Sequence, residues 1–190
     1  NSATSYSGPS AIHLLRATCG QQAHDKMYTP VAEKCYLMNS LLRAGFEPNL
    51  ALNHDGKFDN FIGQLQTNGR LTAPPLPLDG VSVAQHAFDG TPVYDDLSVL
   101  NRWLERRQQS DVARVALYYN TISLHDGNRV VGSALTSIDS YPQRATKLMN
   151  DFDHLADLIA QSGRRAVIVF VPEHGAALRG DHNQVAGLRE

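Results

Sequence analysis

Cysteine is scarce in this sequence, which contains only Cys19 and Cys35 and no Cys-x-x-Cys pair. The lack of such pairs argues against a structural zinc site built from cysteines. In an oxidising compartment, a disulfide between the two residues would close a loop whose constraint stabilises the fold by roughly 3 kcal/mol. Two unrelated buried thiols are an equally good interpretation of the count.

Charge of one sign and long apolar runs are also lacking. The formal net charge is -2, so there is no basic surplus for binding nucleic acid. No run has the length of a transmembrane helix, and no segment has the pattern of a signal peptide. With 42% hydrophobic residues the chain can bury a sizeable core, which predicts one globular domain. We expect residues 1–190 to be a fragment of a longer protein.

Short apolar runs alternate with segments of helical periodicity. Strands are expected at 46–53, 113–119 and 166–171, with a weaker one at 81–88. Helices are expected at 10–17, 35–44, 58–69, 94–109 and 141–162. The alternation predicts an α/β fold with a mostly parallel sheet and helices on both faces.

Three of the predicted strands end in similar polar clusters. These are His54-Asp55-Gly56, His125-Asp126-Gly127 and Glu173-His174-Gly175. The carboxyl ends of parallel strands meet at one edge of the sheet, where α/β proteins bind their ligands. The sequence therefore predicts that the three clusters form one site.

The residue types at this edge favour metal-assisted phosphoryl transfer. Glu173 and His174 are of the types that bind zinc. Ser7 lies at or beside the start of the first helix, where backbone N–H groups can hold a phosphoryl oxygen, and a nearby metal would make its hydroxyl a nucleophile. A plain capping serine is the alternative. His125 is a candidate for proton transfer.

Other interpretations of the polar residues stay open. A Ser-His-Asp hydrolase ranks lower because Ser7 lacks the Gly-x-Ser-x-Gly elbow. His54 either contacts substrate or is a structural turn residue. Asp95 and Asp96 suggest either a second metal site or, more simply, acidic residues at a helix start.

Five blocks of sequence resemble one family along nearly the whole chain. The blocks are NSATSYSG (1–8), RATCG (16–20), FDGTPVYDD (88–96), YNT with LHDGN (119–121 and 124–128) and VPEHG (171–175). Together they are similar to the phosphoethanolamine transferases of bacterial cellulose synthesis, the G subunit of that system. The pair Glu173-His174 and the serine at position 7 favour this branch over the lipid A phosphoethanolamine transferases, which carry Asp-His and a threonine.

The resemblance implies a three-layer, alkaline-phosphatase-like α/β/α fold and a zinc-dependent enzyme. The enzyme would move phosphoethanolamine from phosphatidylethanolamine to the 6-hydroxyl of glucose units in cellulose, with the cellulose synthase complex as partner. Its catalytic domain would face the periplasm, anchored in the inner membrane by a segment outside this chain. The resemblance further implies that the remaining zinc ligand is a cysteine upstream of Asn1 and that the domain continues beyond Glu190.

The resemblance also implies roles for single residues. Ser7 would be the nucleophile and a zinc neighbour, Glu173 and His174 zinc ligands, and His125 the proton-transfer or phosphate-binding histidine. The remaining implied assignments are Tyr6 lining the site, Arg189 binding the phosphoryl group and Cys19 pairing with Cys35. Two other classes remain as alternatives: a phosphatase or sulfatase of the same superfamily, and a non-catalytic subunit that binds the synthase or the glucan.

Overall fold

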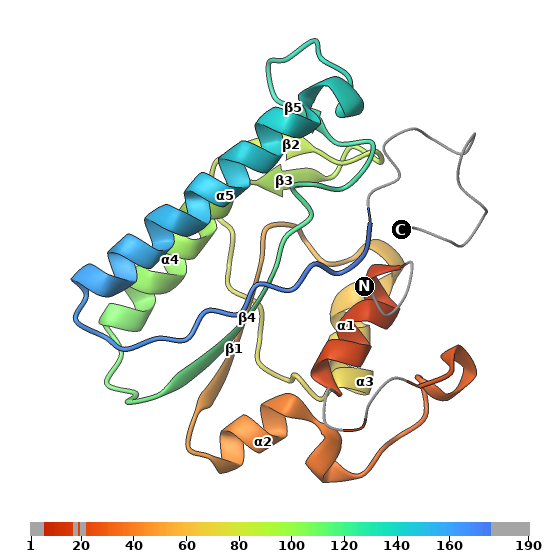
Figure 1. Ribbon diagram of the computed structural model, residues 1–190, viewed down its shortest axis with the longest axis vertical. Coiled ribbons are helices and arrows are strands. Elements are labelled where there is room, and N and C mark those ends of the chain that lie inside the picture. The colour runs from red at the N-terminus through yellow and green to blue at the C-terminus, as the bar shows by residue number, and fades with distance from the viewer. Residues whose placement is uncertain (1–5, 17–18, 20–21, 176–190) are drawn as a thin grey trace.

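The computed structural model describes residues 6–16, 19 and 22–175 (Figure 1). The α-helices are α1 (Ser7–Leu15), α2 (Leu37–Arg43), α3 (Phe61–Gly69), α4 (Asp96–Gln108) and α5 (Ser137–Gln161). Short 3₁₀ helices are η2 (His24–Lys26), η3 (Glu33–Cys35) and η4 (Phe58–Asn60). The strands are β1 (Glu47–Leu52), β2 (Val83–His86), β3 (Pro92–Tyr94), β4 (Val115–Asn120) and β5 (Arg129–Val130). Among these residues, no helix is long and apolar enough to span a bilayer.

The core is built on the parallel pair of β1 and β4, whose register places Leu52 opposite Asn120. Alternate side chains of the pair point to opposite faces. On one face, Leu50, Leu52 and Tyr118 pack against α1, α2 and α3. On the other face, Ala51 packs with residues of α4, and α5 lies against α4 (Figure 1). The prediction of an α/β fold with helices on both faces of a parallel sheet is confirmed.

A second, antiparallel sheet was not predicted. It has the strand order β3-β2-β5, and its β2–β3 hairpin includes the turn at Asp89 and Gly90. Thr91 N–H donates to the Asp89 carboxylate across this turn, at 2.9 Å. The weak strand expected at 81–88 is therefore β2, but it pairs with antiparallel neighbours and does not extend the parallel sheet.

Helix caps explain where α4 and α5 begin. The Asp95 side chain accepts a hydrogen bond from the Ser98 N–H at 3.0 Å, so α4 starts at Asp96 and not at Tyr94 as expected. Thr136 accepts from the Asp139 N–H at 3.1 Å, which starts α5 four residues before the expected Tyr141. Side chains that cap a helix in this way satisfy N–H groups that the first turn leaves without partners.

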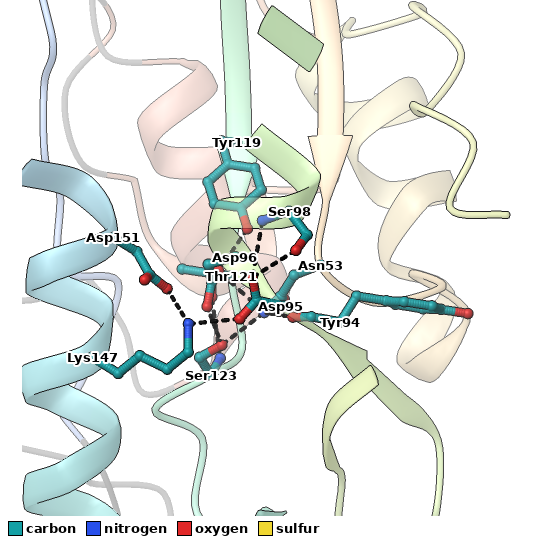
Figure 2. Close-up of polar contacts among 10 residues, drawn as sticks. All are labelled: Asn53, Tyr94, Asp95, Asp96, Ser98, Tyr119, Thr121, Ser123, Lys147 and Asp151. Carbon is teal, nitrogen blue, oxygen red and sulfur yellow. Dashed lines mark hydrogen bonds and ion pairs between the residues drawn. The ribbon is translucent and has the colours of Figure 1, made fainter. Parts of the chain in front are cut away.

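A buried polar cluster joins the ends of β1 and β4 to the start of α4 (Figure 2). The Asp96 carboxylate accepts hydrogen bonds from Tyr119 OH at 2.6 Å, from Asn53 Nδ2 at 3.2 Å and from the Ser123 hydroxyl. The side-chain oxygen Oδ1 of Asn53 accepts a hydrogen bond from the Ile122 N–H at 2.9 Å. These contacts fix the backbone immediately beside the two strand ends that carry candidate site residues.

The prediction of a strand at 166–171 is wrong. This segment has neither strand nor helix geometry, and its apolar side chains are exposed, Val167 by 89% and Val169 by 75%. An apolar run becomes a strand only when a neighbouring backbone supplies hydrogen bonds. Within the described residues, the parallel sheet consists of β1 and β4 alone.

The predicted disulfide between Cys19 and Cys35 is confirmed. It ties the segment that follows α1 to the segment that precedes α2. The Cys19→Ser/Cys35→Ser double variant is expected to lose about 3 kcal/mol in free energy of unfolding, because the unfolded chain gains the entropy of an open loop. Urea unfolding of both proteins with and without dithiothreitol measures this loss. A reductant effect of equal size on the wild type and the variant would contradict the prediction.

Candidate metal-assisted transfer site

The start of α1 meets the segment of residues 171–175 at the carboxyl edge of the parallel pair (Figure 1). The Ser7 hydroxyl lies 3.1 Å from His174 Nε2, although 167 positions separate the two residues in the chain. Tyr6 is the N-cap residue of α1, and Ser7 is the first helical residue. The Ser7 hydroxyl therefore faces the Glu-His segment and does not cap its own helix.

Glu173 is largely buried, and two residues of the described part of the chain hold it by hydrogen bonds. Its Oε1 accepts from Asn120 Nδ2 at 3.2 Å, and its backbone carbonyl accepts from the Ser10 hydroxyl at 3.1 Å. Burial raises the pKa of Glu173 to about 7, although hydrogen bonds from Ser7 and Asn120 act in the opposite direction. A cation beside this carboxylate would offset the cost of burying its charge.

The imidazole of His174 has the orientation of a metal ligand. Its Nδ1 lies 2.8 Å from the backbone carbonyl of Gly175, so Nδ1 carries the proton and donates it. The lone pair of the neutral ring is then on Nε2, the atom that faces Ser7. Histidines that bind metals commonly anchor the second ring nitrogen on a carbonyl in this way.

His125 lies at the same edge, as the sequence predicted. Its Nδ1 lies 2.8 Å from the Asp126 carbonyl and 3.2 Å from the Asp126 carboxylate, so Nδ1 is the protonated nitrogen. Nε2 of the neutral ring is consequently the atom that can accept a proton. The ring centroid lies 6.5 Å from that of His174 and stacks on Phe88 at 5.9 Å.

His54 does not offer a nitrogen to a substrate. Nε2 lies 2.9 Å from Asn120 Oδ1, and Nδ1 accepts from the Gly56 N–H at 3.1 Å. Burial lowers the pKa of His54, which keeps the ring neutral. Of the two roles considered for His54, the structural one agrees with this geometry.

The other candidate residues from the sequence are not part of the Ser7–His174 contact or lie outside the described residues. Tyr6 lies at the start of α1, next to Ser7, with 54% of its surface exposed. Arg189 lies outside the described residues. Asp95 caps α4 and pairs with Lys147 at 2.6 Å, while Asp96 is the centre of the buried polar cluster (Figure 2). The interpretation of these two acids as helix-start residues therefore agrees with the structure.

Sequence reasoning missed Asn120 and Ser10. Asn120 ends β4 and contacts both His54 and Glu173, and Ser10 follows Ser7 by one helical turn and holds the backbone of Glu173. The position of Asn120 at the end of an apolar run was visible in the sequence. Its partners were not, because they come from other segments of the chain.

The donor atoms suit a zinc ion in type but form an incomplete set. Glu173, His174 and the Ser7 hydroxyl supply oxygen and nitrogen donors of the kind found in zinc sites. Within the described ranges, no three His, Cys, Asp or Glu side chains converge as a metal-binding group. These residues thus fit part of a metal site that needs at least one further ligand.

The fold and the site define an α/β domain whose sheet edge brings a serine hydroxyl, a carboxylate and two imidazoles together. The model of the family described as "Cellulose biosynthesis protein BcsG C-terminal domain" matches residues 1–190, and the chain belongs to this family. It is 44% identical over 190 residues to the cellulose biosynthesis protein BcsG of Escherichia coli (strain K12) and, equally, to that of Salmonella typhimurium (strain LT2). All of this chain is covered in both comparisons, but only 34% of each relative, so the chain spans about a third of their length.

Proposed function

We propose that this chain is part of the catalytic domain of a zinc-dependent transferase that acts in cellulose biosynthesis. It moves phosphoethanolamine from phosphatidylethanolamine to glucose 6-hydroxyls of cellulose through a covalent serine intermediate. The main support for this proposal is that the Ser7 hydroxyl lies 3.1 Å from His174 Nε2 and also contacts the Glu173 carboxylate. Membership of the BcsG family supports the cellulose context, and the five resembling blocks support the donor and the acceptor.

Ser7 is the nucleophile of the proposed reaction. Glu173 and His174 would hold zinc, which lowers the pKa of the serine hydroxyl and offsets charge on the phosphoryl oxygens. The Ser7 proton passes to solvent, its Oγ forms a bond to phosphorus, and the bond from phosphorus to the diacylglycerol oxygen breaks. Tyr6 and Arg189 contribute to binding of the phosphoryl group.

His125 transfers one proton in each half-reaction. In the first, the protonated ring gives the proton on Nε2 to the departing diacylglycerol oxygen. In the second, the neutral ring takes the proton of the sugar hydroxyl as that oxygen attacks phosphorus, and the departing Ser7 oxygen regains a proton from solvent. The bond from Nδ1 to Asp126 keeps Nε2 as the exchanging atom throughout.

The location follows from the same proposal. The protein is held in the inner membrane by a segment outside this chain, with the catalytic domain in the periplasm beside the cellulose synthase complex. The disulfide between Cys19 and Cys35 supports an oxidising compartment. Phosphatidylethanolamine would reach the site from the membrane surface.

Substitution of His125 tests its proton-transfer role. His125→Gln is expected to lower kcat for transfer to a cello-oligosaccharide by about 10²–10⁴-fold, since glutamine keeps hydrogen bonding but cannot accept a proton at neutral pH. The matched control is His86→Gln in β2, where Nδ1 of the exposed imidazole lies 3.3 Å from the Gly90 carbonyl of the hairpin turn. Equal rates for the two variants would contradict the assignment.

The decisive test is intact mass spectrometry of the full-length protein with zinc and phosphatidylethanolamine. A phosphoethanolamine adduct on the wild type, absent from Ser7→Ala, would establish covalent transfer and the nucleophile together. Free phosphoethanolamine without a sugar product would indicate the hydrolase alternative. Failure of the wild type both to bind zinc and to form an adduct would overturn the proposal in favour of a non-catalytic subunit.

A further inference from the structure

Glu173 depends on other segments for its position. It lies in a stretch that has no strand or helix geometry, so its own backbone does not fix the carboxylate. Ser10 holds its backbone carbonyl, and Asn120 Nδ2 holds its Oε1 at 3.2 Å. A metal ligand on an irregular segment needs such contacts, because otherwise the conformational entropy lost on ordering the segment weakens metal binding.

Asn120 is itself oriented by His54. The Gly56 N–H can only donate, so His54 Nδ1 must accept, and the proton of the neutral ring is on Nε2. Nε2–H then donates to Asn120 Oδ1 at 2.9 Å. This bond fixes which end of the side-chain amide is oxygen, and it turns the NH₂ group toward Glu173 Oε1.

The three residues form a chain of hydrogen bonds in one direction, from His54 through Asn120 to Glu173. Its first two members follow or end neighbouring parallel strands, since His54 comes two positions after Leu52 and Asn120 is opposite Leu52 in the register. Both are at least 90% buried, with 8% of each residue exposed. These hydrogen bonds therefore connect the Glu173 carboxylate, which lies outside the sheet, to the rigid β1–β4 pair.

We propose that Asn120 and His54 are positioning residues that hold the Glu173 carboxylate in the orientation in which it binds zinc. The inference rests on the proposed function, because it assumes that Glu173 is a metal ligand. Bonding of one carboxylate oxygen to a rigid amide fixes the plane of the carboxyl group before the ion arrives. Residues that orient metal ligands in this way typically change metal affinity by about 10–100-fold when they are replaced.

The test is the zinc dissociation constant of the full-length protein, measured by competition with a chromophoric chelator. Asn120→Ala is expected to weaken zinc binding about 10–100-fold. The matched control is Asn49→Ala, the third residue of β1, where the side-chain amide oxygen accepts from Trp103 Nε1 at 3.1 Å. This control is expected to leave zinc affinity within about threefold of the wild type, whatever stability it loses.

A pair of His54 variants separates positioning from folding. Gln places an NH₂ group near the position of Nε2, so His54→Gln is expected to keep the hydrogen bond to Asn120 and the zinc affinity of the wild type. His54→Leu removes this hydrogen bond and is expected to lower zinc affinity about tenfold. Equal affinity of His54→Gln and His54→Leu, or wild-type affinity of Asn120→Ala, would overturn the inference alone. A wild-type protein that does not bind zinc would overturn the proposed function and this inference with it.

Discussion

Ser7→Ala is expected to lower kcat for phosphoethanolamine transfer by at least about 10⁴-fold, the scale seen when a covalent nucleophile is removed. The reason is that the methyl group of alanine cannot form the bond to phosphorus, and His174 and Glu173 then face no attacking oxygen. The rate of phosphoethanolamine transfer to a cello-oligosaccharide measures the effect. Little change in free energy of unfolding is expected, because the Ser7 hydroxyl does not cap α1.

Ser10→Ala is the matched control for the nucleophile. Ser10 lies one turn further along the same helix and donates to the Glu173 backbone carbonyl at 3.1 Å. Loss of one such hydrogen bond costs about 1 kcal/mol, so at most about a tenfold decrease in rate is expected. A Ser7→Ala rate within tenfold of the Ser10→Ala rate would rule out Ser7 as the nucleophile.

The parts of the fold that sequence predicted well are those that local composition decides. Leu50-Ala51-Leu52 is a buried run because helices cover both faces of β1, and such runs are recognisable without knowledge of the partner strand. Ser7 and His174 lie within 3.1 Å of each other, but the rule that parallel strands end at one edge does not explain this contact, because residues 166–171 form no strand and Ser7 begins a helix.

The parts that sequence missed depend on contacts between distant segments. Asn120 has a role only because His54 lies 66 positions and Glu173 lies 53 positions away from it in the chain, yet both are within hydrogen-bond distance. The run from 166 to 171 has the composition of a buried strand, but strand geometry also needs a neighbouring backbone. Asp96 resembled any helix-start acid, and only tertiary packing made it a buried acceptor.

Asp96→Ala is expected to lower the free energy of unfolding by about 3–5 kcal/mol. The carboxylate of Asp96 is the common acceptor for Tyr119 OH, Asn53 Nδ2 and the Ser123 hydroxyl (Figure 2). Alanine would leave these donors buried without this partner, which costs more than the loss of an exposed contact. Urea unfolding at neutral pH measures the change.

Asp95→Ala is the control for Asp96, since it removes a neighbouring carboxylate with different contacts. Asp95 caps α4 and pairs with Lys147 near the surface, so a loss of only about 1–2 kcal/mol is expected. Similar losses in the two variants would show that the buried cluster adds nothing beyond a helix cap.

The pH dependence of the contribution of Asp96 to the free energy of unfolding shows whether burial or hydrogen bonding dominates the pKa of its carboxyl group. Burial raises the pKa of Asp96 above its ordinary value, although hydrogen bonds from Ser123, Thr121 and Tyr119 act the other way. The folded state then binds the Asp96 proton more tightly than the unfolded state, so this stabilisation is present below the ordinary pKa and is lost as pH rises through the folded pKa. Asp96→Asn cannot titrate there. The free energy of unfolding of the wild type relative to that of Asp96→Asn is therefore expected to be greater at about pH 4 than at about pH 7. If this difference in free energy instead grows with pH, the hydrogen bonds outweigh burial.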